Sequence, residues 1–178
     1  MKKILGLLTA VLVTASVSSY ATSNEDVLDI DTYNKHISDA MELYQASDYD
    51  AALPLIEVSA MRGDKTSQYV LGTMYLNGQG TEQDLIKSYS WLTVANEQKS
   101  PHWKKPLEML DEKLPADFLD LAKTEAEKYV EQFGVKTQQL KCRNIKTLGS
   151  KKGSHLCLKS EVKPGYYYVS SPTLLVSK

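Results

Sequence analysis

Two cysteines, Cys142 and Cys157, are the residues of this chain with the clearest covalent chemistry. An even pair indicates a disulfide if the protein is exported, because oxidising compartments keep thiols paired. The bond would close the loop 143–156 and contribute about 3 kcal/mol on the loop-entropy model. A metal site is the alternative, since His155 lies two residues before Cys157. Two thiols and one imidazole match a closed zinc site poorly, because such a site takes about four ligands. We therefore predict a disulfide and no metal.

Other patterns give little support for catalysis. His36, His102 and His155 lie in different predicted elements, without a serine, cysteine or carboxylate at a catalytic spacing. The Gly78-Gln79-Gly80 segment follows a predicted helix and lacks the Gly-Lys-Ser/Thr of a phosphate-binding loop, so we interpret it as a connection between helices. We predict no catalytic residue and no cofactor.

The first residues have the three parts of a secretory signal peptide. Lys2 and Lys3 precede an apolar run over residues 4–13, and small residues follow up to Ala21. We predict cleavage after Ala21. The alternative is a membrane anchor, which needs about 20 apolar residues, whereas this run is interrupted from Thr14 onward. We expect a periplasmic or secreted protein that is not inserted in the membrane after cleavage.

The charge of the chain excludes some partners. Removing Lys2 and Lys3 with the signal peptide takes the formal charge from −1 to −3. So small a charge gives no electrostatic reason to expect binding to nucleic acid or to anionic lipid.

The remainder divides into three parts by composition. Residues 22–32 are polar and acidic, and we expect a flexible lead-in. Residues 33–134 have the 3.6-residue rhythm of amphipathic helices, interrupted by glycine, proline and capping residues. Residues 135–178 hold glycine, proline and short apolar runs at 166–169 and 174–176, which predict about two to four short strands stapled by the disulfide.

The helical part repeats itself. The pattern predicts helices over about 32–46, from Asp48 or Asp50 to Gly63, from Asp64 to Gly78, and from Asp84 to about residue 95, followed by a further pair within 102–134. Tyr44 recurs as Tyr75 after 31 residues, and Ala60 recurs as Ala95 after 35 residues, each with similar neighbours. A repeated helix pair of this length is typical of an α-solenoid, in which each unit buries one face on the next.

The segment from Ala60 to Ala95 resembles a Sel1-like repeat, a tetratricopeptide-like helix pair. Its small, aromatic and capping positions match in order at Ala60, Gly63, Leu71, Gly72, Tyr75, Gly78, Gly80, Asp84, Trp91 and Ala95. Thr81 and Ser88 depart from the pattern, where the family has an aliphatic residue and alanine. Residues 33–64 resemble a degenerate preceding unit, and 102–134 a terminal helix pair. The resemblance implies a right-handed α-α superhelix, so we predict an all-α solenoid with a small, disulfide-stapled, β-rich appendage at 135–178.

The resemblance implies a binding scaffold, which we interpret as a periplasmic adaptor that binds another envelope protein or peptide in a cell-envelope assembly. At about 100° per residue, Tyr69, Thr73 and Leu76 fall on one side of the third helix and are the candidate contact residues. Alternatively, they pack against the neighbouring unit.

Two other functions stay open, namely a hydrolase acting on an envelope substrate, and binding through the tail with the repeats as support. Some Sel1-like proteins with cysteine-paired repeats have been discussed as hydrolases. No cysteine lies within a repeat here, so the resemblance does not carry that activity over.

Overall fold

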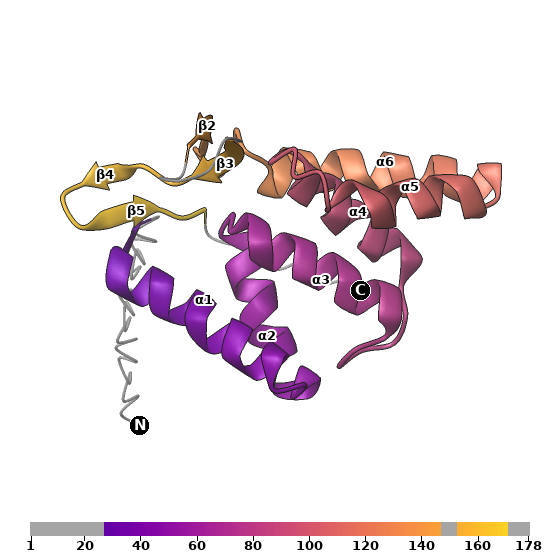
Figure 1. Ribbon diagram of the computed structural model, residues 1–178, viewed down its shortest axis with the longest axis horizontal. Coiled ribbons are helices and arrows are strands. Elements are labelled where there is room, and N and C mark those ends of the chain that lie inside the picture. Colours follow the sequence, from indigo (N-terminus) through magenta and orange to yellow (C-terminus); the bar gives the residue numbers. More distant parts are fainter. Residues whose placement is uncertain (1–26, 147–152, 171–178) are drawn as a thin grey trace, which may run out of the picture.

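The computed structural model of this protein, which describes residues 27–146 and 153–170, is mostly helical (Figure 1). Within these residues there are six helices: α1 (Ile30–Gln45), α2 (Tyr49–Met61), α3 (Lys65–Asn77), α4 (Leu85–Asn96), α5 (Lys104–Lys113) and α6 (Ala116–Phe133). The helices expected from the sequence are confirmed to within a few residues. The predicted signal peptide and the apolar run at 174–176 lie outside the described residues.

Aspartates begin the first four helices. Asp29, Asp48, Asp64 and Asp84 each accept a hydrogen bond from the backbone N–H three residues further on. The first N–H groups of a helix have no partner within the helix, so each such cap stabilises it by about 1 kcal/mol. Of the two caps considered for the second helix, the structure shows Asp48. The caps at Asp64 and Asp84 are those that the sequence predicted.

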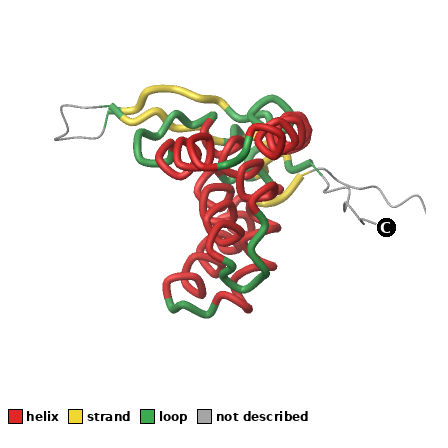
Figure 2. The backbone as a smooth tube through the Cα atoms, turned by 90° about the vertical axis from the view of Figure 1, so that its right-hand side faces the viewer, coloured by secondary structure: helices red, strands yellow, loops and turns green. Residues whose placement is uncertain are grey.

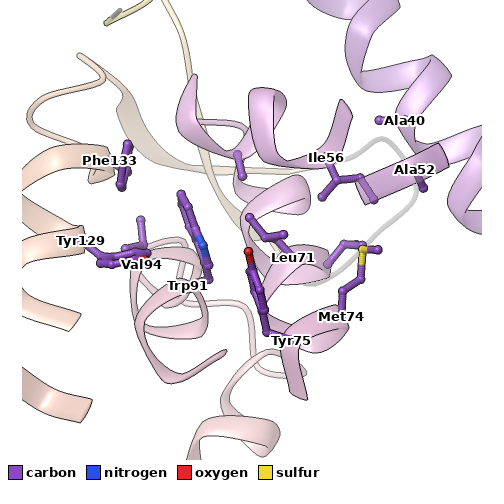
Figure 3. Close-up of a cluster of buried hydrophobic side chains, with 12 residues drawn as sticks. Ala40, Ala52, Ile56, Leu71, Met74, Tyr75, Trp91, Val94, Tyr129 and Phe133 are labelled. Carbon is purple, nitrogen blue, oxygen red and sulfur yellow. The ribbon is translucent and has the colours of Figure 1, made fainter. Parts of the chain in front are cut away.

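Neighbouring helices pack in chain order, with α1 on α2, α2 on α3 and α3 on α4, and α4 packs against both α5 and α6. One hydrophobic cluster runs through these contacts from Ala40 on α1 to Phe133 on α6 (Figure 3). Trp91 on α4 lies near its α6 end, with ring centroids 5.1 Å from Tyr129 and 5.0 Å from Phe133. A second cluster joins α4, α5 and α6 through Tyr89, Leu92, Leu110, Ala122 and Ala126.

Two glycines permit close contacts between elements. A Cβ on Gly72 would lie 2.8 Å from Cγ of Leu92, so the absence of a side chain lets α3 approach α4. Gly80 has φ of 68°, and its Cβ would lie 2.7 Å from the carbonyl carbon of Tyr49. The backbone of the loop after α3 therefore packs directly against the backbone of the first residue of α2.

The tail and the segment before α1 form two small antiparallel sheets, whose strands lie in the upper part of Figure 2. The strands of the described residues are β1 (Val27–Asp29), β2 (Lys141–Ile145), β3 (Ser154–Leu158), β4 (Glu161–Lys163) and β5 (Tyr166–Tyr168). β2 pairs with β3, and Cys142 lies opposite Cys157, to which it is joined by a disulfide. The predicted disulfide is thus confirmed.

The flexible lead-in expected at 22–32 is wrong for its described part. Residues 27–29 form β1, which pairs with β5 in a sheet of order β1-β5-β4, and α1 already begins at Ile30. The prediction rested on the polar composition of this segment. Asp29 is polar because it caps α1, and a strand of three residues is too short to show the alternation of apolar and polar side chains that identifies a strand. The ring of Tyr33 on α1 also meets Tyr167 of β5 edge to face at 5.3 Å. The N-terminal segment and the tail therefore form one structural unit.

Replacing Gly80 by Ala should lower the free energy of unfolding by about 3 kcal/mol, because the methyl group would collide with the Tyr49 backbone and the left-handed conformation would be strained. Gly165→Ala is the matched control, since Gly165 also has positive φ, of 81°, but nothing within 4 Å of its Cβ. Gly165→Ala should lower the free energy of unfolding by about 1 kcal/mol. Urea denaturation measures both, and equal losses would contradict the close contact.

Replacing Cys142 and Cys157 together by Ala should destabilise the β2–β3 hairpin by about 3 kcal/mol, because its unfolded loop is no longer closed. Hydrogen exchange of the β3 amides, with and without a reducing agent, measures this. Reduction of the wild type should reproduce the effect and leave the double variant unchanged. Unchanged protection in the variant would show that packing alone holds the hairpin.

Candidate functional site

The histidines are separated in the structure, and two of them bind neighbouring groups. Nδ1 of His36 accepts a hydrogen bond from the Arg62 guanidinium at 2.7 Å. His155 donates through Nδ1 to the carbonyl oxygen of Gln98 at 2.9 Å, whereas His102 is exposed. Within residues 27–146 and 153–170, no three His, Cys, Asp or Glu side chains are grouped to hold a metal. These contacts give His36 and His155 structural roles.

The repeat-signature residues lie at the contacts of α2, α3 and α4. The fully buried ones with apolar side chains are Ala60, Leu71 and Ala95. Gly78 ends α3 in the left-handed conformation, with φ of 66°. Gly63 has φ of 92°, and a Cβ at this position would lie 2.8 Å from Cβ of Gln138, so the absence of a side chain makes room for a residue that follows α6. The repeat-signature residues thus contact the tail as well as the neighbouring helices.

The ammonium of Lys65, at the start of α3, is buried, with 2% of its side chain exposed. It donates to Glu97 Oε2 at 2.7 Å, to the Val94 carbonyl oxygen at 2.9 Å and to Gln68 Oε1 at 2.9 Å. Burial lowers the pKa of Lys65, and the carboxylate of Glu97 opposes that effect. Three acceptors and one counter-charge together compensate the loss of water around the ammonium.

Residues at the C-terminal end of α4 also form hydrogen bonds with the tail. Glu97 Oε2 also accepts from the Val135 N–H at 3.0 Å. Gln98 accepts from His155 through its carbonyl oxygen and from the Cys157 N–H through its side chain, at 2.9 and 3.2 Å. Nothing in the sequence signalled these roles, because a lysine, a glutamate and a glutamine near helix ends are typical of solvated surface.

Four aromatic side chains form a surface feature that we call the aromatic row: Tyr49, Tyr44, Tyr69 and Trp103. Tyr44 of α1 and Tyr49 of α2 have ring centroids 5.5 Å apart, and Tyr69 of α3 stacks on Trp103 at 5.0 Å. Tyr44, Tyr49 and Tyr69 all pack against the first hydrophobic cluster, which links the two pairs. Burial raises the pKa of Tyr69, and Tyr44 adds to the effect. All four side chains are only partly buried.

Of the three contact residues proposed from the sequence, Tyr69 belongs to the aromatic row. Tyr69 and Leu76 also pack against the second hydrophobic cluster, as the packing alternative expects. Thr73 lies one turn from Tyr69, and its hydroxyl donates to the Val70 carbonyl oxygen at 2.7 Å. Sequence reasoning missed Tyr44, Tyr49 and Trp103, although their partly apolar, partly polar rings are typical of interaction surfaces.

A cleft of about 470 Å³ lies elsewhere, between α4 and α6, lined by Tyr89, Thr93, Lys123, Ala126, Glu127, Val130 and Glu131. Its lining combines one lysine with two glutamates, and the hydroxyls of Tyr89 and Thr93 donate to Asp111 and to the Tyr89 carbonyl oxygen. The cleft therefore indicates no particular chemistry.

The fold is similar to that of a solved Sel1-like repeat protein. That protein, a protective antigen present in uropathogenic Escherichia coli strains, displays an SLR fold. The two chains are 22% identical, with a TM-score of 0.54 over 67% of this chain. This chain spans only 27% of the antigen's chain. No family model and no curated protein matches the sequence. The similarity concerns the fold alone.

Replacing Glu97 by Gln should lower the free energy of unfolding by about 2 kcal/mol, because the buried Lys65 ammonium would lose its counter-charge. Adding Lys65→Met should recover much of this loss, since an apolar side chain needs no counter-charge. Glu125→Gln is the control, because the exposed ion pair of Glu125 with Lys128 is worth under about 1 kcal/mol. Urea denaturation of the single and double variants gives the coupling energy. Additive losses would contradict the role of the pair.

Proposed function

We propose that this protein is a protein-interaction scaffold of the Sel1-like kind, which binds a segment of a partner along the aromatic row. The observation that carries the proposal is that three successive helices, α1, α2 and α3, and the turn before α5 each place one partly exposed aromatic side chain on this row. Tyrosine and tryptophan dominate binding energy at protein interfaces, because they bury a large area with few rotatable bonds.

The packing beneath the aromatic row restricts the motion of its tyrosine side chains. Tyr44, Tyr49 and Tyr69 pack against the first hydrophobic cluster, so their rings are held from below. A partner therefore meets side chains that lose little further conformational freedom on binding. We propose that the helix pairs continue this arrangement as a right-handed solenoid, with Tyr69, Thr73 and Leu76 at or beside the contact.

We further propose that the protein acts in the periplasm, after cleavage at Ala21, as an adaptor in a cell-envelope assembly. The composition of residues 1–21 supports export, and a disulfide is typical of oxidising compartments. Among the helices of the described residues, none is long and apolar enough to cross a bilayer. The partner would be another envelope protein or peptide.

Binding through the tail is a second candidate, because three large apolar side chains of the tail are exposed. Leu158, Val162 and Tyr166 are 46%, 50% and 38% exposed. Deleting the tail would not test this cleanly, since it would also remove the groups that bind Glu97 and Gln98. Single surface substitutions are the better probe.

A photo-crosslinking residue at Thr73 should capture a dominant envelope protein when the tagged chain is expressed with its own signal. The same residue at Thr124, exposed on α6, is the matched control and should capture it much less. Adding Trp103→Ala should reduce capture at position 73 by roughly tenfold or more, because an aromatic hot-spot residue typically contributes at least about 2 kcal/mol to binding.

Circular dichroism must show that the Trp103→Ala variant is folded. Capture that survives Trp103→Ala but is lost in Tyr166→Ser would favour the tail instead. Equal capture at positions 73 and 124, or no reproducible partner under several growth conditions, would contradict the scaffold.

A further inference from the structure

A small cleft with a strongly positive lining opens in the tail. It has a volume of about 240 Å³ and is lined by Lys141, Arg143, Leu158, Lys159 and Ser160. Three of these five residues carry a positive charge, one carries a hydroxyl group and none carries a carboxylate. None of them belongs to the aromatic row. A volume below that of a drug-sized pocket suits a single chemical group more than an extended ligand.

The β2–β3 hairpin presents two of the cations together. Lys141 and Arg143 are two residues apart on β2, so their side chains lie on the same face of the strand. Cys142, between them, points to the other face and joins β2 to β3 through the disulfide. The spacing of the two cations is therefore set by a cross-linked strand pair.

Lys159 adds a positive charge that is fixed in place. Its ammonium donates to the carbonyl oxygens of Tyr168, at 2.7 Å, and Gln138, at 3.2 Å, and to Gln138 Oε1 at 3.3 Å. All three acceptors are neutral. Burial, with a further contribution from Arg62, lowers the pKa of Lys159 to about 8. Its charge is thus partly buried without an anion in hydrogen-bond contact.

The other ionisable groups around Lys159 do not neutralise the cleft. The Tyr33 ring of α1 faces the ammonium at 5.9 Å, and Asp64 and Lys159 both line an adjoining cleft of about 340 Å³. Asp64 caps α3 and is bound to Ser67. Within the described parts of the chain, the ion pairs involve other lysines, namely Lys35, Lys65, Lys87 and Lys128. Neither Lys141, Arg143 nor Ser160 makes a side-chain hydrogen bond to another described residue.

We propose that this cleft binds a small oxyanion group, a phosphate or a carboxylate, with Arg143, Lys141 and Ser160 as donors and Lys159 as a fixed positive charge. The planar fork of arginine matches both groups, and charged donors make the strongest hydrogen bonds. The group could be free in solution or displayed on a larger molecule, because the chemistry of recognition is the same. This site is independent of the proposed scaffold function.

The test uses the whole mature chain and inorganic phosphate at constant ionic strength, with chloride as the replacement anion. NMR signals of Ser160 and of the Arg143 guanidinium should shift in a saturable manner. The pKa of Lys159 should rise when phosphate is bound, because a nearby anion favours the charged ammonium.

Arg143→Gln should weaken phosphate binding by at least about tenfold, because one charged donor is lost. Lys163→Gln is the matched control, since Lys163 is an exposed cation of the tail that lies over Tyr166 and lines neither cleft. Arg143 is exposed, so its variant should fold normally. Equal weakening in both variants, or shifts that chloride reproduces, would overturn the proposal.

Two further probes identify the source of the anion. Acetate that competes with phosphate would show that carboxylates are also accepted, and failure to compete would restrict the site to phosphate. Vesicles containing phosphatidylglycerol that compete in the wild type but not in Arg143→Gln would indicate a displayed lipid phosphate. Vesicle binding without any binding of phosphate or acetate would overturn the small-oxyanion site.

Discussion

The buried ammonium of Lys65 fixes how the helices and the tail of this protein meet. An ammonium group without water is costly, so it is stable only where acceptors and a counter-charge surround it. Here they come from α3 itself and from the end of α4, through Gln68, Val94 and Glu97. Since these acceptors must all lie within hydrogen-bond distance, the crossing of α3 and α4 is defined more strictly than apolar packing alone would define it. The close approach at Gly72 and Leu92 is compatible with that crossing.

The hydrogen bonds around Lys65 continue into the tail. Glu97 binds Lys65 and the Val135 backbone with the same oxygen, and Gln98, its neighbour, binds the β3 strand. Gln138 lies against Gly63, and its side-chain amide donates to the Ser170 hydroxyl. Gln68 closes the arrangement by donating to the carbonyl oxygens of Ala60 and Phe133. Buried polar groups that are all satisfied in this way specify one arrangement, because any shift leaves a donor or acceptor unpaired.

This framework supports both proposed binding surfaces. The three tyrosines of the aromatic row lie on helices that pack in the first hydrophobic cluster, and the positively charged cleft lies at a disulfide-linked hairpin that is hydrogen-bonded to Gln98 after α4. Both surfaces are therefore supported by parts of the molecule that have little freedom to rearrange. Contacts between the N-terminal strand β1 and β5 join the first and last described elements, so the two proposed binding surfaces belong to one structural unit.

The sequence by itself determined the helices, the aspartate caps of α2, α3 and α4, the glycines that follow α2 and α3, and the disulfide. These features depend on residues near one another in the chain, or on a single cysteine pair that has no other partner. Tertiary structure alone decided the rest. Lys65, Glu97 and Gln98 look like surface residues until α3, α4 and the tail come together, and β1 becomes a strand only because β5 lies beside it. Likewise, Tyr44 and Trp103 adjoin Tyr69 only after three separate elements pack. Contacts between residues distant in the sequence leave no periodic pattern, because burial and charge pairing depend on which surfaces meet in space.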